Sequence, residues 1–299
     1  MEQKKLLFIF NPRSGKGLIK THLADVIDKM VKAGFSVTVY STQDRGDATR
    51  KVIEEGAFFD RIVCSGGDGT LDEVVAGMQK AGLQIPLGYI PAGSTNDFGR
   101  SVGISNDINK AADAAVSDLL YACDVGKFNE DNFVYVVAFG MFTEISYETP
   151  QELKKILGHL AYILSAGRSL ASIPNYLMQI DVEGRVIQDR FIYGMITNSI
   201  SVGGFKGMTG KDVQLDDGEF EVTLIKYPTN LGELNEIVAS LTNMIDDTDL
   251  IYSFKAKKLH LISKEPIPWT RDGEFGGIHD EVHIENLHKA IQMCVNNIG

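Results

Sequence analysis

SGGDGT at residues 65–70 is the stretch around which the rest of the chain is organised. It follows a short apolar strand pattern, 61–64, and it precedes a helix pattern with apolar residues at the spacing of one helix face. Glycines let a backbone approach an anion closely, and the N–H groups at a helix start attract negative charge. Asp68 would then place a carboxylate beside a phosphate, which requires a cation between them, most simply Mg²⁺. The stretch therefore predicts a phosphate site with a metal, and the alternative is a tight turn with an N-capping aspartate.

The segments on both sides of this stretch alternate between strand and helix patterns as far as about residue 120. Strand patterns lie at 6–10, 35–40, 61–64 and 85–90, and helix patterns lie at about 19–30, 47–55, 71–78 and 108–116. Such alternation predicts a parallel sheet covered by helices.

Three of the predicted strands end in loops that are rich in Gly, Ser, Thr or Asn. These loops follow Phe10, Cys64 and Ile90. Since ligands of open parallel sheets bind at the carboxyl ends of the strands, all three loops should face one crevice. Any one of them could be ordinary turn chemistry, but together they favour a nucleotide site.

From Tyr121 onward, strand patterns dominate. They lie at 132–139, 176–182, 186–197, 220–226, 251–254, 258–262, 282–285 and 290–295, with helix patterns at 153–164 and 234–245. We therefore predict an α/β nucleotide-binding domain at 1–122 and a mainly antiparallel β domain at 123–299, a sandwich or open barrel. The end of the chain could pack back on the first domain.

Composition narrows the class of protein. The formal net charge of −11 disfavours nucleic acid as a partner. Three cysteines, distant in sequence, suggest no disulfide framework and a reducing compartment. We see no signal peptide core and no stretch of membrane-spanning length, so we expect a cytoplasmic protein.

Four segments together resemble the diacylglycerol kinase catalytic-domain family, which includes soluble bacterial lipid kinases. They are NPRSG at 11–15, residues 66–74, residues 91–100 and TRDGE at 270–274. The resemblance implies a parallel α/β domain, like that of NAD kinases and diacylglycerol kinases, followed by a β-rich domain, with the active site between them. It implies transfer of the γ-phosphate of ATP to a lipid hydroxyl, first of all diacylglycerol, giving phosphatidic acid. A sphingoid base or other lipid, a soluble acceptor such as NAD, and a nucleotide-binding regulator without turnover are the alternatives.

The resemblance also implies roles for individual residues. Asp68, Asp97 and Asp124 match aspartates of a magnesium–water network, and Glu274 matches the catalytic base. The positions expected to contact ATP are Asn11, Pro12, Arg13, Ser14, Gly15, Thr42, Gly67, Asp68, Gly69, Thr70, Leu71, Asp72, Glu73 and Ser94. Without the resemblance, we would interpret Asp97 as a helix N-cap, Asp124 as a solvated residue, and the Asp-Gly before Glu274 as a hairpin turn.

Two of these positions depart from the family pattern. Residue 72 is Asp where Asn is usual, which adds negative charge near the phosphates. Residue 94 is Ser where Thr is common, which keeps the hydroxyl. Nucleotide affinity or metal dependence could therefore differ from that of other members.

A structural Mg²⁺ is a further expectation from the resemblance. The turn at 216–218, Asp-Asp-Gly, matches a turn at which some members bind that ion. Asp217 would supply a carboxylate, and Gln214 and Glu219 would supply backbone carbonyls, which suits an oxygen-seeking cation. The alternative is a plain Asp-Gly turn that enters a strand.

Two other stretches look functional. HDEVH at 279–283 resembles a zinc motif, but its glutamate is displaced and the segment has a strand pattern, so we expect no metal there. The helix pattern at 153–164, with Lys154, Lys155 and Arg168, could lie on a membrane surface, although packing over the sheet is the stronger expectation. An enzyme that acts on a bilayer lipid needs transient peripheral membrane contact, and a homodimer remains open.

Overall fold

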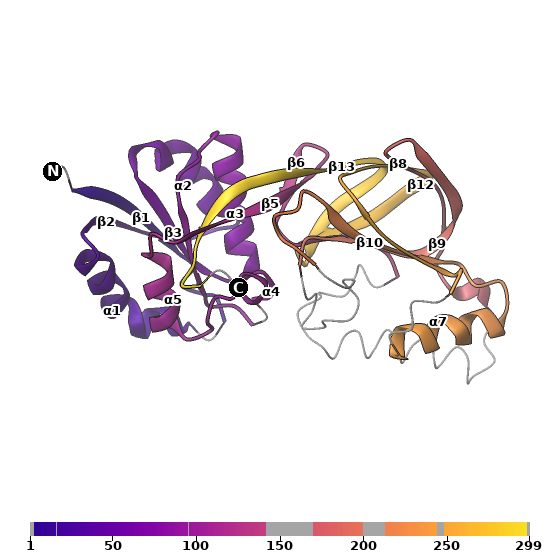
Figure 1. Cartoon of the computed structure of the whole chain (residues 1–299), viewed down its shortest axis with the longest axis horizontal. Helices are drawn as coiled ribbons and strands as arrows, with labels where there is room; N and C mark the ends of the chain where they lie inside the picture. Colours follow the sequence, from indigo (N-terminus) through magenta and orange to yellow (C-terminus); the bar gives the residue numbers. More distant parts are fainter. Residues whose placement is uncertain are drawn as a thin grey trace. The chain divides into compact units, whose positions relative to one another are not determined.

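The computed structural model describes residues 3–15, 17–94, 96–141, 170–199, 213–243 and 248–297. The chain divides into two compact units, which are considered separately below (Figure 1). Unit 1 consists of Met1–Val125, Leu215–Asp217 and Leu287–Gly299, and unit 2 consists of Gly126–Gln214 and Gly218–Asn286. The boundary expected at 122/123 lies close to the break after Val125, and the end of the chain belongs to unit 1, as the sequence analysis allowed. The short segment Leu215–Asp217 was not expected in unit 1.

Unit 1 contains a parallel sheet in the order β4-β3-β1-β2. Its strands are β1 (Lys4–Phe10), β2 (Phe35–Ser41), β3 (Arg61–Gly66) and β4 (Leu87–Pro91). Its helices are α1 (Leu18–Lys32), α2 (Asp47–Glu55), η1 (Gly56–Phe58), α3 (Asp68–Lys80), α4 (Asp97–Ser101) and α5 (Ile108–Ala115). The strand and helix patterns of the sequence are confirmed here to within a few residues.

Continuous apolar strands explain the core of unit 1. Every residue of β1 from Leu6 to Phe10 is buried, as expected for a parallel strand covered on both faces. All three cysteines are buried and unpaired, which confirms that they form no disulfide. Burial raises the pKa of the Cys294 thiol to about 11, so this thiol stays protonated near neutral pH.

Two long strands, β5 (Leu120–Phe128) and β13 (Glu274–Cys294), contribute residues to both units. At its end, β13 pairs in parallel with β4 through Met293 and Leu87. The sequence predicted two strands in this region, at 282–285 and 290–295. The structure has one, because the polar residues between them continue the strand through an irregularity at Lys289, whose φ is +53°.

Unit 2 is an antiparallel sheet with the strand order β11-β10-β9-β7-β12-β13. Its remaining elements are β6 (Asp131–Phe133), β7 (Val136–Gly140), η2 (Leu170–Ser172), β8 (Tyr176–Val182), β9 (Arg185–Thr197), β10 (Phe220–Lys226), α7 (Leu231–Asn243), β11 (Ile251–Ala256) and β12 (Lys258–Arg271). The side chain of Trp269 lies in the core, with its ring centroid 5.3 Å from that of Phe128 and 4.9 Å from that of Phe139. The helix pattern at 153–164 lies outside the described residues.

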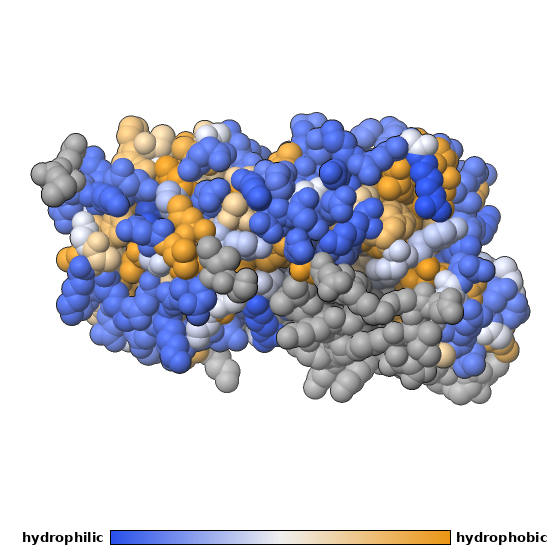
Figure 2. Space-filling model, viewed as in Figure 1, coloured by the Kyte–Doolittle hydropathy of each residue, from blue (hydrophilic) through white to orange (hydrophobic). Residues whose placement is uncertain are grey.

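The surface of the described residues is mixed in character. In the view of Figure 2, hydrophilic residues cover much of each unit, and apolar residues are scattered among them, which is usual for globular proteins. Within the described ranges, no helix combines the length and the apolar character needed to cross a membrane.

Candidate active site

The loop after β1 is tied to the glycine-rich turn after β3. The backbone N–H of Asn11 donates to the carbonyl of Ser65 at 2.8 Å, and its side-chain amide lies 3.4 Å from the Thr70 hydroxyl. The N–H of Gly67 donates to the hydroxyl of Ser14 at 3.3 Å. The two loops therefore form one polar surface.

The loop after β4 joins the same surface by close backbone contact. A Cβ on Gly15 would lie 2.4 Å from the carbonyl oxygen of Ala92, and the φ of Gly15 is +53°. A Cβ on Gly93 would lie 2.6 Å from the Cα of Gly67. Only glycine fits such approaches, so the glycines are what allow three loops to meet at one edge of the sheet, as the sequence predicted.

Asp68 and Asp97 come together at this edge. They are the first residues of α3 and α4, and their exposed fractions are only 8% and 1%. The N–H of Asp97 donates to the carboxylate of Asp68 at 3.1 Å. The N-cap of α4 is Asn96, with a φ of +53°, so the N-cap interpretation of Asp97 is wrong. Two buried acidic residues side by side fit a divalent cation, which would offset the cost of burying their charges.

Tyr89 supports the turn from within the core of unit 1. Its hydroxyl donates to the carbonyl of Gly66 at 3.2 Å. Burial, with a further contribution from the charge of Asp68, raises the pKa of the Tyr89 hydroxyl well above its usual value. The hydroxyl therefore remains a neutral donor and keeps the glycine turn in place.

Asp124 belongs to a second polar group of unit 1. It is fully buried in β5, and its carboxylate accepts from the N–H of Lys289 at 2.7 Å and lies 3.1 Å from Nδ1 of His288. Its own N–H donates to the carbonyl of Leu215 at 2.7 Å. The interpretation of Asp124 as a solvated residue is thus wrong. His288 and Lys289 were missed, because nothing in the local sequence pairs them with a residue more than 160 positions earlier.

Glu274 opens β13 after a two-residue hairpin turn. Arg271 and Glu274 are paired across the turn, and Asp272 and Gly273 have φ values of +48° and +81°. Positive φ at both central positions is the requirement of a type I′ hairpin, and Asp-Gly is a favoured sequence for it. The hairpin interpretation is confirmed, and the turn leaves the Glu274 side chain exposed to solvent.

Comparison with known proteins identifies the family. The family model described as "Diacylglycerol kinase catalytic domain" matches residues 5–128. A protein of Staphylococcus carnosus named diacylglycerol kinase is 37% identical over 92% of this chain and 90% of its own length. The chain belongs to the diacylglycerol kinase family. A Bacillus subtilis protein of the same name is 36% identical over 98% of this chain and 96% of its own length.

The solved structures agree with this membership. A Bacillus anthracis diacylglycerol kinase is 25% identical, with a TM-score of 0.77 over 99% of this chain and 98% of that one. As a member of the diacylglycerol kinase family, the chain is a kinase that transfers phosphate to an alcohol group. Membership implies the use of ATP with a divalent cation, and the loops and carboxylates of unit 1 offer suitable groups for both.

Two of the positions expected to contact ATP have structural roles in this family member. The carboxylate of Glu73 accepts from the N–H groups of Gly46 at 2.7 Å and Ala48 at 3.2 Å, at the start of α2. Leu71 is fully buried in the core. Any contact of Leu71 with a nucleotide would therefore use its backbone. Thr42, by contrast, lies at the end of β2 with its N–H bonded to the carbonyl of Phe10 at 3.0 Å, beside the first loop.

The turn at 214–219 has the conformation of an Asp-Gly turn. Gly218 has a φ of +79°, Asp217 is half-buried, and Gln214 is exposed. The neighbouring Asp216 accepts from the hydroxyl of Tyr121 at 3.2 Å. The turn is thus anchored to β5, and the metal there stays a prediction.

Asp272 has a role that sequence reasoning did not assign to it. Its carboxylate, in a residue that is 5% exposed, accepts from the N–H groups of Val134, Tyr135 and Val136 at 2.6, 3.0 and 2.9 Å. These bonds fix the hairpin that carries Glu274. The only signal in the sequence was the Asp-Gly pair, which explains the turn but not the anchor.

Removal of the Asp272 carboxylate should destabilise the protein strongly. Asp272→Ala leaves three buried N–H groups without their acceptor, and each such loss costs about 1–3 kcal/mol. We expect the free energy of unfolding in urea to fall by at least about 3 kcal/mol. Glu285→Ala, which removes an exposed ion pair with Lys258 elsewhere on β13, should cost at most about 1 kcal/mol. Equal urea midpoints for the two variants would contradict the anchoring role.

Proposed function

We propose that this kinase transfers the γ-phosphate of ATP to a lipid hydroxyl, with diacylglycerol as the substrate and phosphatidic acid as the product. The observation that carries the proposal is the contact between Asp97 and the Asp68 carboxylate where three loops meet. The names of the Staphylococcus carnosus and Bacillus subtilis relatives support diacylglycerol as the acceptor.

The nucleotide is assigned to the loops of unit 1. The residues are Asn11–Gly15, Thr42, Gly67–Glu73 and Ser94, whose backbone N–H groups and short hydroxyls can surround phosphate oxygens. Asp68, Asp97 and Asp124 would hold Mg²⁺, directly or through water. When bound, that ion would neutralise charge on the phosphates, which with positioning is the main source of catalysis in phosphoryl transfer.

Glu274 is assigned as the general base. A lipid hydroxyl is a poor nucleophile, and a carboxylate within reach can accept its proton during transfer. The exposure of Glu274 and the rigid hairpin that carries it support this role. The substrate lies in a bilayer, so the proposal includes transient peripheral contact with a membrane, a cytoplasmic location and no nucleic-acid partner.

A direct assay separates this function from its rivals. Labelled γ-phosphate from ATP is offered to diacylglycerol in mixed micelles, to a sphingoid base in the same micelles, and to NAD in solution. We expect product from diacylglycerol above all. Product from the sphingoid base or NAD alone would move the function to those acceptors, and ATP binding without any transfer would indicate a regulator.

The proposed structural Mg²⁺ at Asp217 can be tested through stability. The protein is stripped of metal with a chelator, and Mg²⁺ is then restored at about 100 times its dissociation constant. At that concentration, an ion that binds only the folded state raises the free energy of unfolding by about 2.7 kcal/mol. We expect the thermal midpoint to rise for the native chain and for Asp68→Asn, and to rise by clearly less for Asp217→Asn, which keeps only the cation site at Asp68 and Asp97. An equal rise in the native chain and in Asp217→Asn would favour the plain turn.

A further inference from the structure

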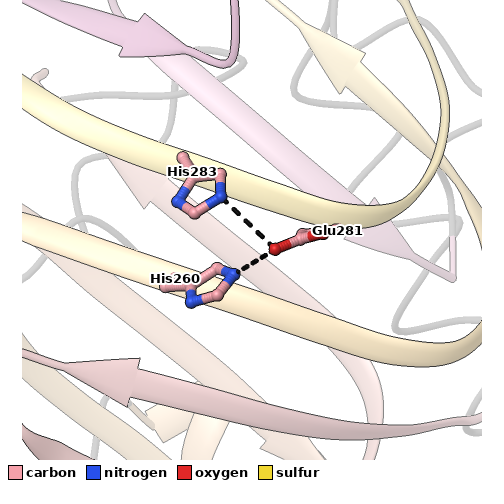
Figure 3. A group of neighbouring side chains, drawn as sticks. All are labelled: His260, Glu281 and His283. Atoms are coloured by element: carbon pink, nitrogen blue, oxygen red, sulfur yellow. Dashed lines mark hydrogen bonds and ion pairs between the residues drawn. The ribbon is translucent and has the colours of Figure 1, made fainter.

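Three side chains of unit 2 bring metal-ligating atoms together on two neighbouring strands, apart from every residue assigned above (Figure 3). His260 lies on β12, and Glu281 and His283 lie on β13. His260 and His283 are direct partners across the two strands. One ligand atom from each of the three residues lies within 4.8 Å of the others.

One nitrogen of each imidazole ring lies near the same carboxylate oxygen of Glu281. Nε2 of His260 lies 2.8 Å from Oε1 of Glu281, and Nε2 of His283 lies 3.5 Å from the same oxygen. The two imidazole rings are stacked, with centroids 4.1 Å apart and an interplanar angle of 12°. Two imidazole nitrogens and a carboxylate oxygen that lie this close together are ligand types that suit a transition metal ion.

The core of unit 2 fixes the positions of these residues. Their neighbours Leu259, Leu261, Val282 and Ile284 point to the opposite face of the sheet and are at most 2% exposed. Since successive side chains of a strand point to opposite faces, the three candidate ligands are held on the solvent side of the same pair of strands. An ion can therefore reach them without any rearrangement of the backbone.

We propose that His260, Glu281 and His283 bind a divalent first-row transition metal ion and that this ion is Zn²⁺, with water completing the coordination. Imidazole nitrogens discriminate against Mg²⁺ and Ca²⁺, which prefer oxygen ligands, so this site differs in kind from the one at Asp217. For both rings to direct their nitrogen lone pairs at one ion, they must turn out of the stack.

The bound ion would connect β12 and β13, the two strands that form the hairpin carrying Glu274. Binding to the folded state alone raises stability by mass action. Binding of the ion should therefore raise the thermal midpoint of the protein, and the role of the ion is structural.

The sequence analysis expected no metal at 279–283, because the stretch taken alone lacks the spacing of a zinc motif. The segment is a strand, as predicted, and His279 is directed to the carbonyl oxygen of Gly276 at 3.0 Å. His279 is therefore engaged with the backbone in this structure, and the stretch 279–283 by itself does not bring two histidines to one ion. The second histidine of the proposed site is His260, which lies 21 positions before Glu281 in the sequence. It becomes a neighbour of Glu281 and His283 only because β12 pairs with β13.

Titration of the full chain with Zn²⁺ tests the site. The chelator-stripped native protein is compared with His260→Asn, His283→Asn and Glu281→Gln, with His22→Asn on α1 as the matched control. Mutation of a residue that merely orients a metal ligand commonly lowers metal affinity by about tenfold or more. Loss of a ligand itself should lower the affinity for Zn²⁺ by at least that factor. We expect weaker Zn²⁺ binding in all three site variants and unchanged binding in the control.

A second measurement on the native chain does not depend on the folding of the variants. Zn²⁺ should shift the ring proton signals of His260 and His283 in NMR spectra and leave those of His22 and His279 in place. The thermal midpoint of Asp217→Asn should rise with Zn²⁺ as it does in the native chain. Equal affinities in native protein and site variants, or ring shifts confined to other histidines, would overturn the proposal.

Discussion

Asp68→Ala should abolish phosphoryl transfer while the chain stays folded. The variant loses the carboxylate of one of two buried acidic residues that are in contact at the edge where the three loops meet, and with it the main ligand expected for the cation of ATP. Removal of a single preorganised electrostatic group from an active site commonly costs about 10²–10³-fold in kcat, and loss of a metal ligand should cost more. The rate of labelled phosphate transfer to diacylglycerol, at saturating ATP, measures the effect.

Two further variants separate charge from structure in this test. Asp68→Asn keeps an acceptor for the N–H of Asp97, so it should fold as the native chain does and still lose transfer. Asp25→Asn, on the exposed face of α1, removes one negative charge from unit 1 and should leave the rate unchanged. Near-native turnover in a folded Asp68→Ala would show that the cation is held elsewhere.

Glu274→Gln should slow transfer to the lipid and leave nucleotide binding almost unchanged. Glutamine keeps the size and hydrogen-bonding capacity of the side chain but removes most of its basicity. General bases contribute about 10²–10⁴-fold, so kcat should fall by that factor. The dissociation constant for ATP, from titration in the absence of lipid, should stay within about twofold because the base acts on the acceptor.

The matched control for this variant is Glu265→Gln, an exposed glutamate on the neighbouring strand β12. It should have native kcat and native ATP affinity. If Glu274→Gln transferred phosphate to diacylglycerol at the native rate, the base assignment would be wrong, whereas the assignment of the nucleotide loops would be unaffected.

The α/β unit was predictable from sequence because its signals are local. The apolar run at β1 and the apolar face of α3 each specify their element without reference to any other part of the chain. The meeting of the loops also followed, because parallel strands present their carboxyl ends at one edge. The loops that carry Asp68 and Asp97 could therefore be placed at one edge of the sheet, whereas the role of Asp97 beside a metal came from the resemblance to the diacylglycerol kinase family.

The features that sequence reasoning missed depend on contacts between distant segments. Nothing local to Asp272 indicates that its carboxylate accepts from three N–H groups more than 130 positions earlier. The same holds for Asp124, whose partners His288 and Lys289 lie near the end of the chain. It also holds for β13, which ends by pairing with β4. His260 joins His283 only through strand register, which a one-dimensional motif search does not see.

Whether the three loops bind one nucleotide can be measured directly from backbone amide signals in NMR spectra. Mg·ATP is added to the native chain, and the signals of Gly67, Gly69 and Gly93 are followed together with those of unit 2. If the loops bind the phosphates, these three amides should show some of the largest shifts, and the shifts should be lost in Asp68→Asn at the same nucleotide concentration. Saturable binding of Mg·ATP that leaves the three glycine amides unshifted would contradict the proposed site.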